Sequence, residues 1–253
     1  MICLSRGAWV LWLLGYPDQA LARSQEARTL AQQLAHPFSL GYALSAAAKF
    51  HQLRREAHCT QACAETVLSL AQEQGFSHWL AYGACYRGWA LAQQGQAKEG
   101  IEQINQSMMD YRATGAEHIR PYWLALLAEA HGTLGEPEAG LTVLAAALTL
   151  AETTGDRWYD PELYRLKGAL LLQQNSDNQA EVEACFHKAL DLARNQQAKS
   201  LELRAATSLA RLWHQQGKRQ EAHDLLAPVY GWFTEGFDTA DLLEAKALLD
   251  ALA

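Results

Sequence analysis

Long apolar runs are missing from this sequence. The nearest candidate is residues 8–16, AWVLWLLGY, which is far shorter than the roughly 20 apolar residues that a membrane-spanning helix needs. Arg6 is the only basic residue ahead of it and no small-residue cleavage site follows, so it does not fit a secretory signal peptide. We therefore expect a core helix here, in a cytoplasmic protein without a membrane partner.

A basic excess is also missing. Lysine and arginine total 21 against 28 acidic residues, and the net charge of −7 at pH 7 leaves nothing to neutralise phosphates. Nucleic acid is therefore excluded as an expected partner. The five cysteines form an odd, scattered set in a chain too large to depend on disulfides, which favours reduced thiols in the cytoplasm.

Motifs for catalysis and for nucleotide binding are absent as well. The sequence has no G-x-x-x-x-G-K-[ST] loop, no Ser/His/Asp or Cys/His set at catalytic spacing, and no paired carboxylates beside an apolar run. His58, Cys59 and Cys63 lie close together, but with only His51 nearby they do not complete a zinc site, and small packing cysteines are the favoured interpretation. We expect no enzyme, no cofactor and no metal.

Helix-forming residues are abundant. Alanine, leucine, glutamine and glutamate dominate a sequence that is 49% hydrophobic and only 9% aromatic, which predicts an all-α fold with a substantial core.

The sequence also repeats itself about every forty residues. A small residue recurs at Ala8, Ala48, Gly88, Ala128, Gly168 and Ala210, as expected where two helices pack closely. A turn residue follows seven positions later, at Gly15, Arg55, Gly95, Gly135 and Gly217; in the fifth copy the segment 175–179, NSDNQ, replaces it and carries two extra residues. Prolines in the same register mark helix starts at Pro17, Pro121, Pro137 and Pro161.

Each unit is therefore predicted to be a pair of helices, which in the third unit span roughly 77–94 and 97–113. The six pairs are predicted at about 1–36, 37–76, 77–116, 117–156, 157–198 and 199–234. A capping helix is predicted at 238–252, with Asp238 and Thr239 as N-cap candidates and Leu242, Ala245 and Leu249 on one face. The predicted fold is one domain over 1–253, a right-handed superhelical solenoid of thirteen helices. Because the first unit begins almost at Met1, the chain is expected to start at a repeat boundary.

The period alone would favour HEAT or armadillo repeats. Small residues at positions 8, 20 and 27 of the unit and glycine at position 15 are instead typical of tetratricopeptide repeats, and residues 183–190, EACFHKAL, resemble their second helix. The chain resembles most the long-repeat tetratricopeptide tails of large bacterial signal-transduction proteins, in which a nucleotide cyclase, kinase or DNA-binding module precedes a predicted regulatory ATPase. The resemblance rests on LWLLGYPDQALARSQEA (11–27), HPFSLGYAL (36–44), ELYRLKGALLL (162–172) and WFTEGFDTADLLEAKALL (232–249).

This resemblance implies that the first helix of each pair lines a concave surface. The inward positions that it assigns predict a partner-binding groove made of Tyr42, Lys49, Tyr82, Trp89, Tyr122, Glu129, Arg165, Arg204 and Arg211, with Gln52 and Glu162 among its neighbours. The groove is expected to be aromatic towards the first half of the chain and basic towards the last. Trp89, Arg165 and Arg211 are expected to be solvent-accessible in one continuous groove, whereas the periodic tyrosines fit either the groove or packing between helices.

Two functions follow from this groove. The leading one is an interaction module or scaffold that holds a protein, a peptide or another domain of its own full-length protein, as the tail of a larger signalling ATPase or cyclase. The alternative is a small-ligand sensor that relays binding to an upstream NTPase. A closed, deep pocket would favour the sensor, and an open groove with unpaired basic residues would favour peptide capture.

Overall fold

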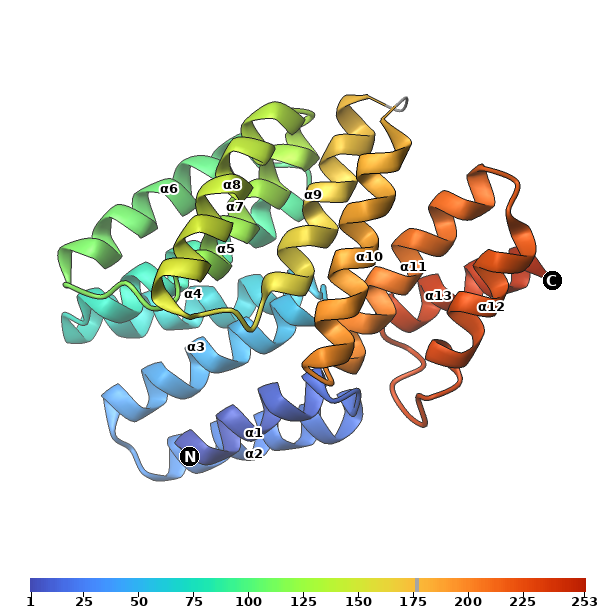
Figure 1. Cartoon of the computed structure of the whole chain (residues 1–253). Coiled ribbons are helices and arrows are strands. Elements are labelled where there is room, and N and C mark those ends of the chain that lie inside the picture. The colour runs from blue at the N-terminus through green and yellow to red at the C-terminus, as the bar shows by residue number, and fades with distance from the viewer. Residues whose placement is uncertain (176–177) are drawn as a thin grey trace.

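The computed structural model describes residues 1–175 and 178–253 of the chain (Figure 1). Within those residues it contains thirteen α-helices and no strand, as the sequence predicts. The helices are α1 (Ile2–Leu13), α2 (Pro17–Gln33), α3 (Pro37–Leu53), α4 (Ala57–Gln74), α5 (Ser77–Gln93), α6 (Ala97–Ala113), α7 (Arg120–Leu134), α8 (Pro137–Thr154), α9 (Asp160–Gln174), α10 (Gln179–Asn195), α11 (Lys199–Gln215), α12 (Arg219–Tyr230) and α13 (Ala240–Leu252).

Consecutive helices pack as antiparallel pairs, from α1 with α2 to α11 with α12, and α13 packs on the last pair (Figure 1). Proline occupies the first turn of α2, α7, α8 and α9 at the four predicted positions, where its missing N–H costs no hydrogen bond. The two extra residues predicted in the fifth turn fall within 175–179, of which 176–177 lie outside the described residues.

The small residues of the repeat lie where paired helices touch. A Cβ atom on Gly88 would lie 2.8 Å from the carbonyl oxygen of Gly100 in α6, and one on Gly168 would lie 2.6 Å from Cε1 of Phe186 in α10. No side chain fits at such distances, so the repeated small residue sets how closely the two helices of a pair approach.

The turn residues of the repeat share a left-handed backbone. Gly15, Gly95, Gly135 and Gly217 all have φ between 80° and 88°, and Arg55 takes the same region at 63°. This conformation costs a residue with a Cβ atom more than it costs glycine. Arg55 therefore occupies a turn whose backbone favours glycine.

The last helices return to the first ones. Glu235, between α12 and α13, accepts hydrogen bonds of 3.0 Å from the backbone N–H groups of Asp18 and Gln19 at the start of α2. In addition, Ser200 Oγ of α11 donates to the Trp12 carbonyl of α1 at 2.5 Å. The row of pairs thus curls until its first and last units meet, which encloses part of the surface formed by α3, α7, α9 and α11. Among the described helices, none has the length and hydrophobicity needed to cross a membrane.

Candidate functional site

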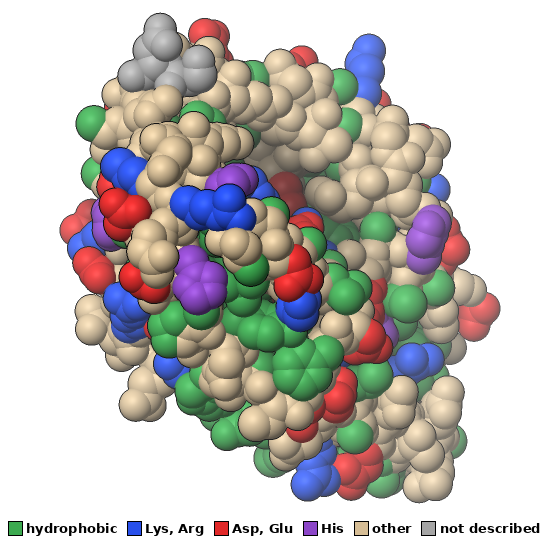
Figure 2. All heavy atoms as spheres, turned by 90° about the vertical axis from the view of Figure 1, so that its right-hand side faces the viewer, with side chains coloured by type: hydrophobic (Ala, Val, Ile, Leu, Met, Phe, Trp, Pro, Cys, Tyr) green, Lys and Arg blue, Asp and Glu red, His purple; other side chains and the backbone are tan. Residues whose placement is uncertain are grey.

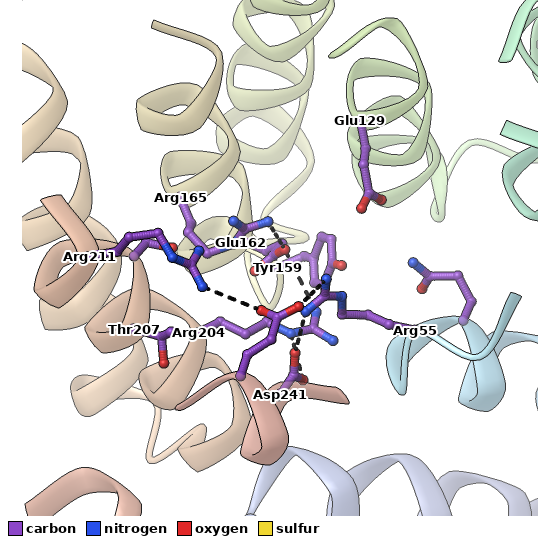
Figure 3. Close-up of a pocket in the computed structure, with 12 residues that line it drawn as sticks. Arg55, Glu129, Tyr159, Glu162, Arg165, Arg204, Thr207, Arg211 and Asp241 are labelled. Atoms are coloured by element: carbon purple, nitrogen blue, oxygen red, sulfur yellow. Dashed lines mark hydrogen bonds and ion pairs between the residues drawn. The ribbon is translucent and has the colours of Figure 1, made fainter. Parts of the chain in front are cut away.

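A cavity rich in charged side chains lies at the centre of the curled chain. It has a volume of about 200 Å³ and is lined from α3, α7, α9, α11 and α13, with Arg55 reaching it from the turn after α3 (Figure 3). We call it the charged cavity. Its guanidinium groups belong to Arg55, Arg165, Arg204 and Arg211, and its carboxyl groups to Glu129, Glu162, Asp241 and Glu244.

Arg204 joins three parts of the chain at this cavity. Its Nε donates to Asp241 Oδ2 of α13 at 2.9 Å, and its Nη1 lies 3.7 Å from Glu162 Oε1 of α9. Its Nη2 donates to the Leu53 carbonyl at the end of α3. Burial opposes the ionisation of Glu162, but the guanidinium groups of Arg165 and Arg204 hold the pKa of this carboxyl below its ordinary value. Arg204 is 7% exposed and is committed to holding the curled chain together.

Arg55 and Arg211 are the more accessible cations of the charged cavity. Arg55 lies 3.2 Å from Asp241 Oδ1 and 2.9 Å from Glu244 Oε1, so the residue with the unfavourable turn backbone contributes its side chain to the cavity. The side chain of Arg211 is 49% exposed, and its Nη2 is 3.8 Å from Glu244 Oε2. Figure 2 shows the end of the molecule that carries the last helices, where a recess opens among side chains of both signs.

The prediction for Trp89 is wrong. It was expected to be solvent-accessible in the groove, but it is 1% exposed, and its Nε1 donates to Glu129 Oε2 at 2.7 Å. Position 9 of the unit does point inwards, but in a tightly curled solenoid the next repeat covers it. Burial raises the pKa of Glu129, although the hydrogen bond from Trp89 favours the ionised form.

A second cavity lies towards the first half of the chain and is lined mainly by rings. It has a volume of about 570 Å³, and Trp9 of α1, Tyr42 of α3, Trp79 and Tyr82 of α5, and Trp158 of the segment between α8 and α9 form much of its wall. We call it the aromatic cavity. Trp9 and Trp158 meet edge to face with ring centroids 4.6 Å apart, and Tyr42 meets Trp79 in the same way at 5.9 Å.

Lys49 brings a cation into this aromatic wall. Its Nζ lies 3.7 Å from the ring centroid of Trp9, 4.3 Å from that of Trp158 and 5.0 Å from that of Tyr122. Burial lowers the pKa of Lys49 to about 7, against the opposing effect of the Asp156 carboxylate. The lysine is thus close to half neutral at physiological pH.

The predicted groove residues are divided between the two cavities. Tyr42, Lys49 and Tyr82 line the aromatic cavity, and Glu129, Arg165, Arg204 and Arg211 line the charged cavity. Trp89 and Tyr122 line neither; Tyr122 is fully buried and its hydroxyl donates to Gln52 Oε1. The expectation of one continuous groove through Trp89, Arg165 and Arg211 is therefore wrong, because the curled chain buries Trp89 beneath Glu129.

Several residues that line the two cavities were not predicted from the sequence. They are Trp9, His78, Trp79, His118, Asp156 and Trp158 of the aromatic cavity, and Asp241 and Glu244 of the charged cavity. For Trp9 a signal existed, since it holds position 9 of the unit, one period before Lys49. Asp156 and Trp158 lie between helices, where the repeat carries no inward mark.

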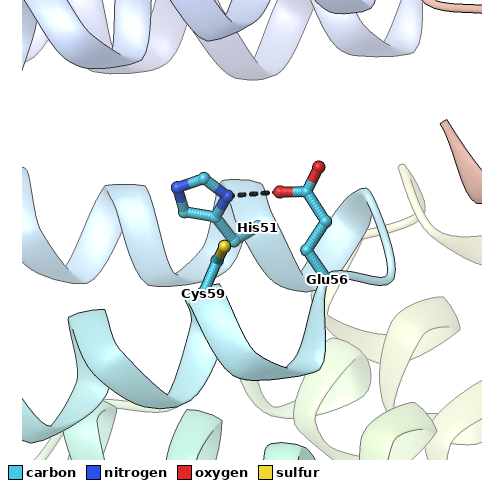
Figure 4. A group of neighbouring side chains, drawn as sticks. All are labelled: His51, Glu56 and Cys59. Carbon is cyan, nitrogen blue, oxygen red and sulfur yellow. Dashed lines mark hydrogen bonds and ion pairs between the residues drawn. The ribbon is translucent and has the colours of Figure 1, made fainter. Parts of the chain in front are cut away.

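His51, Glu56 and Cys59 bring a nitrogen, an oxygen and a sulfur within 4.8 Å of one another (Figure 4). His51 Nδ1 lies 2.5 Å from Glu56 Oε2, and Arg54 Nε donates to the other carboxylate oxygen at 2.7 Å. The same tie recurs two periods later between His131 and Glu136, at 2.9 Å. A histidine–glutamate contact that closes the turn inside a pair explains this cluster without a metal.

No protein-family model matches the chain, and no curated protein matches it in sequence. Solved structures match its fold. The apo form of RapI superposes with a TM-score of 0.65 at 10% identity, over 98% of this chain and 83% of RapI. Aspartyl phosphate phosphatase F from Bacillus subtilis gives 0.61 at 14% identity, over 89% of this chain and 57% of that protein.

A Signal Transduction ATPase with Numerous Domains that carries a tetratricopeptide repeat sensor, from Pyrococcus horikoshii, gives a TM-score of 0.56 at 12% identity. The match covers 98% of this chain and 38% of the ATPase, so the chain spans well under half of that protein. At these identities the likeness establishes the fold, which is an all-α solenoid of tetratricopeptide-like helix pairs.

Proposed function

We propose that this chain is a non-catalytic protein-interaction module, a cytoplasmic regulatory part of a larger signalling protein. In this proposal the charged cavity anchors a carboxylate of a bound protein segment, either an acidic side chain or a chain terminus. A volume of about 200 Å³ suits one such group rather than a whole peptide, the rest of which would lie across the rim.

The observation that carries the proposal is the state of Arg211. Arg55, Arg165 and Arg204 each have a carboxylate oxygen within 3.2 Å, whereas Arg211 is half-exposed with its nearest one at 3.8 Å. Burial raises the pKa of Glu129, the carboxyl group that bonds to Trp89 rather than to an arginine of the cavity. An incoming carboxylate would complete a pair that the folded chain leaves loose.

The setting in a larger protein is supported by two likenesses. The sequence segments named above resemble the repeat tails of signalling proteins, and the archaeal ATPase of similar fold is described as having a tetratricopeptide repeat sensor. The partner is accordingly a protein or peptide, including other domains of the same full-length protein. The cytoplasmic location follows the cysteine usage.

A peptide library tests this proposal. The wild-type chain is used to select twelve-residue peptides with free carboxyl termini, and the affinity of the enriched peptides is measured by fluorescence anisotropy. We expect Arg211→Gln to weaken binding by about tenfold or more, and capping the anchoring carboxylate as an amide to do the same. Arg112→Gln is the matched control, because Arg112 lies on α6, away from the cavity, with a side chain that is 60% exposed. Equal affinity of the wild type and Arg211→Gln would overturn the proposal.

The small-ligand sensor, the other function expected from the sequence, gains support from a different place. The aromatic cavity is the larger of the two cavities described above and is walled by rings, as small-molecule sites commonly are.

A further inference from the structure

Basic groups outnumber acidic ones around the aromatic cavity. Arg6, Lys49, His78 and His118 contribute to its wall, and within the described residues Asp156 is its single carboxyl group. When Lys49 is protonated, a ligand that carries negative charge complements this wall.

The ammonium group of Lys49 is the central feature of this wall. Three rings surround it, and rings attract a cation without accepting the directed hydrogen bonds that an ammonium group donates in water. The charge of Asp156 raises the pKa of Lys49. No oxygen of the described residues accepts a hydrogen bond from Lys49 Nζ. The donors of Lys49 are therefore available to an acceptor that the chain itself does not provide.

Other polar atoms of the same wall are unpaired too. Ser5 Oγ, Ser45 Oγ and Trp9 Nε1 are buried and find no hydrogen-bond partner within the part of the chain that the structure describes. Buried polar groups in folded proteins are almost always paired, and a concentration of exceptions in one cavity is expected where a bound molecule completes the bonding.

We propose that the aromatic cavity binds a planar aromatic carboxylate, with its ring among the indole and phenol side chains and its carboxylate at Lys49 Nζ. The volume of about 570 Å³ lies within the range of roughly 300–1,000 Å³ that small-molecule sites occupy. Trp9, Tyr42, Tyr82 and Trp158 line the cavity and are only partly buried, so a flat ring can pack against them. This inference stands apart from the peptide-binding proposal, which concerns the charged cavity.

Binding of such an anion would be coupled to proton uptake. The titratable or charged groups that face Lys49 across the cavity are Asp156, Arg6, His78 and His118, together with the phenols of the wall. Burial lowers the pKa of Lys49 to about 7, so at pH 8 most of it is neutral, and a carboxylate placed at Nζ would raise that pKa again. Burial also lowers the pKa of His78, which keeps this imidazole out of the titration at pH 8.

Isothermal titration calorimetry with 2-naphthoate tests the inference at pH 8, in two buffers that differ in ionisation enthalpy. We expect saturable binding with about one proton taken up for each naphthoate, and at least tenfold weaker binding of the uncharged isostere 2-naphthamide. Lys49→Met, which keeps the length and the apolar stem, is expected to bind both compounds alike without proton uptake. Lys98→Met, on the exposed face of α6, serves as the matched control and should behave as the wild type.

Several outcomes would overturn the inference: no binding of naphthoate at millimolar concentration, equal affinity for the acid and the amide, or a Lys49→Met variant that binds naphthoate as the wild type does. Arg211→Gln separates the two proposals, since it should leave naphthoate binding and its proton uptake unchanged while it weakens peptide binding. Near-ultraviolet circular dichroism of each variant confirms that the aromatic wall is still assembled.

Discussion

Trp89 and Glu129 are joined by a hydrogen bond of 2.7 Å from the indole Nε1 to the carboxyl Oε2, and they lie one period of forty residues apart. Trp9 and Lys49 have the same relationship, with the ammonium group 3.7 Å from the indole ring. Position 9 of one unit thus meets position 9 of the next. Glu129 and Lys49 therefore each face a ring from the preceding unit, whereas Arg211, at the same position of the last unit, is half-exposed.

Replacing Trp89 by phenylalanine should destabilise the fold by about 1–3 kcal/mol, because it leaves the buried carboxyl of Glu129 without its donor. Denaturant unfolding measures the change. Trp213→Phe is the matched control, since Trp213 Nε1 donates at 2.8 Å to Glu183, whose side chain is 27% exposed and can turn to water. Trp213→Phe should lower the free energy of unfolding by less than about 1 kcal/mol. Equal losses in the two variants would show that the burial of Glu129 adds nothing to the effect of removing its donor.

Replacing Gly88 by alanine should also destabilise the fold by about 1–3 kcal/mol, since the added Cβ would lie 2.8 Å from the backbone of Gly100 and force α5 and α6 apart. Gly7→Ala in α1 is the control, because a Cβ there meets nothing within 4 Å. The free energy of unfolding of Gly7→Ala should rise by up to about 1 kcal/mol, because alanine has a higher helix propensity than glycine. Thermal unfolding of both variants in parallel checks the prediction, and destabilisation by both alike would contradict it.

The features that could be predicted from the sequence depend on neighbours along the chain. Pro137 marks the start of α8, Gly135 the turn before it, and Gly88 the contact between α5 and α6, because each is set within one helix pair. Periodicity reports such local rules directly. The fold class and the two helices of the third unit were predictable for this reason.

The enclosure of the site was not predictable in this way. Glu235 meets Gln19 across 216 positions of sequence, and this contact depends on the summed rotation of six helix pairs, which no single residue encodes. The inward position of Trp89 in its unit predicts an exposed side chain, and its burial follows from the tight curl. Only part of the lining of the charged cavity could be predicted. Its residues in α9 and α11 follow the repeat, whereas Asp241 belongs to α13, which is placed against α11 by the fold of the whole chain.

Replacing Arg204 by methionine should cost about 3–5 kcal/mol, because it leaves Glu162 and Asp241 without their buried cation and removes the donor to the Leu53 carbonyl. Arg211 lies about two helical turns further along α11 and is half-exposed, so Arg211→Met should change stability by less than about 0.5 kcal/mol. Urea unfolding of the two variants distinguishes them. A small loss for Arg204→Met would mean that this side chain does not hold α11 to α3, α9 and α13.

Replacing Lys49 by methionine should change how stability depends on pH. Burial lowers the pKa of Lys49 from 10.5 to about 7, so between these two values the unfolded chain binds more protons than the folded one, and the contribution of Lys49 makes the wild type more stable as pH rises. At pH 7 the methionine variant should therefore be more stable than the wild type by about 2–4 kcal/mol, and this difference should shrink steadily towards pH 10. Urea unfolding at pH 7, 8.5 and 9.5 measures it, with the exposed Lys98→Met as the variant that should track the wild type throughout. A difference between Lys49→Met and the wild type that stays constant with pH would show that Lys49 titrates in the folded chain as it does in the unfolded one, and that the rings around it leave it fully hydrated.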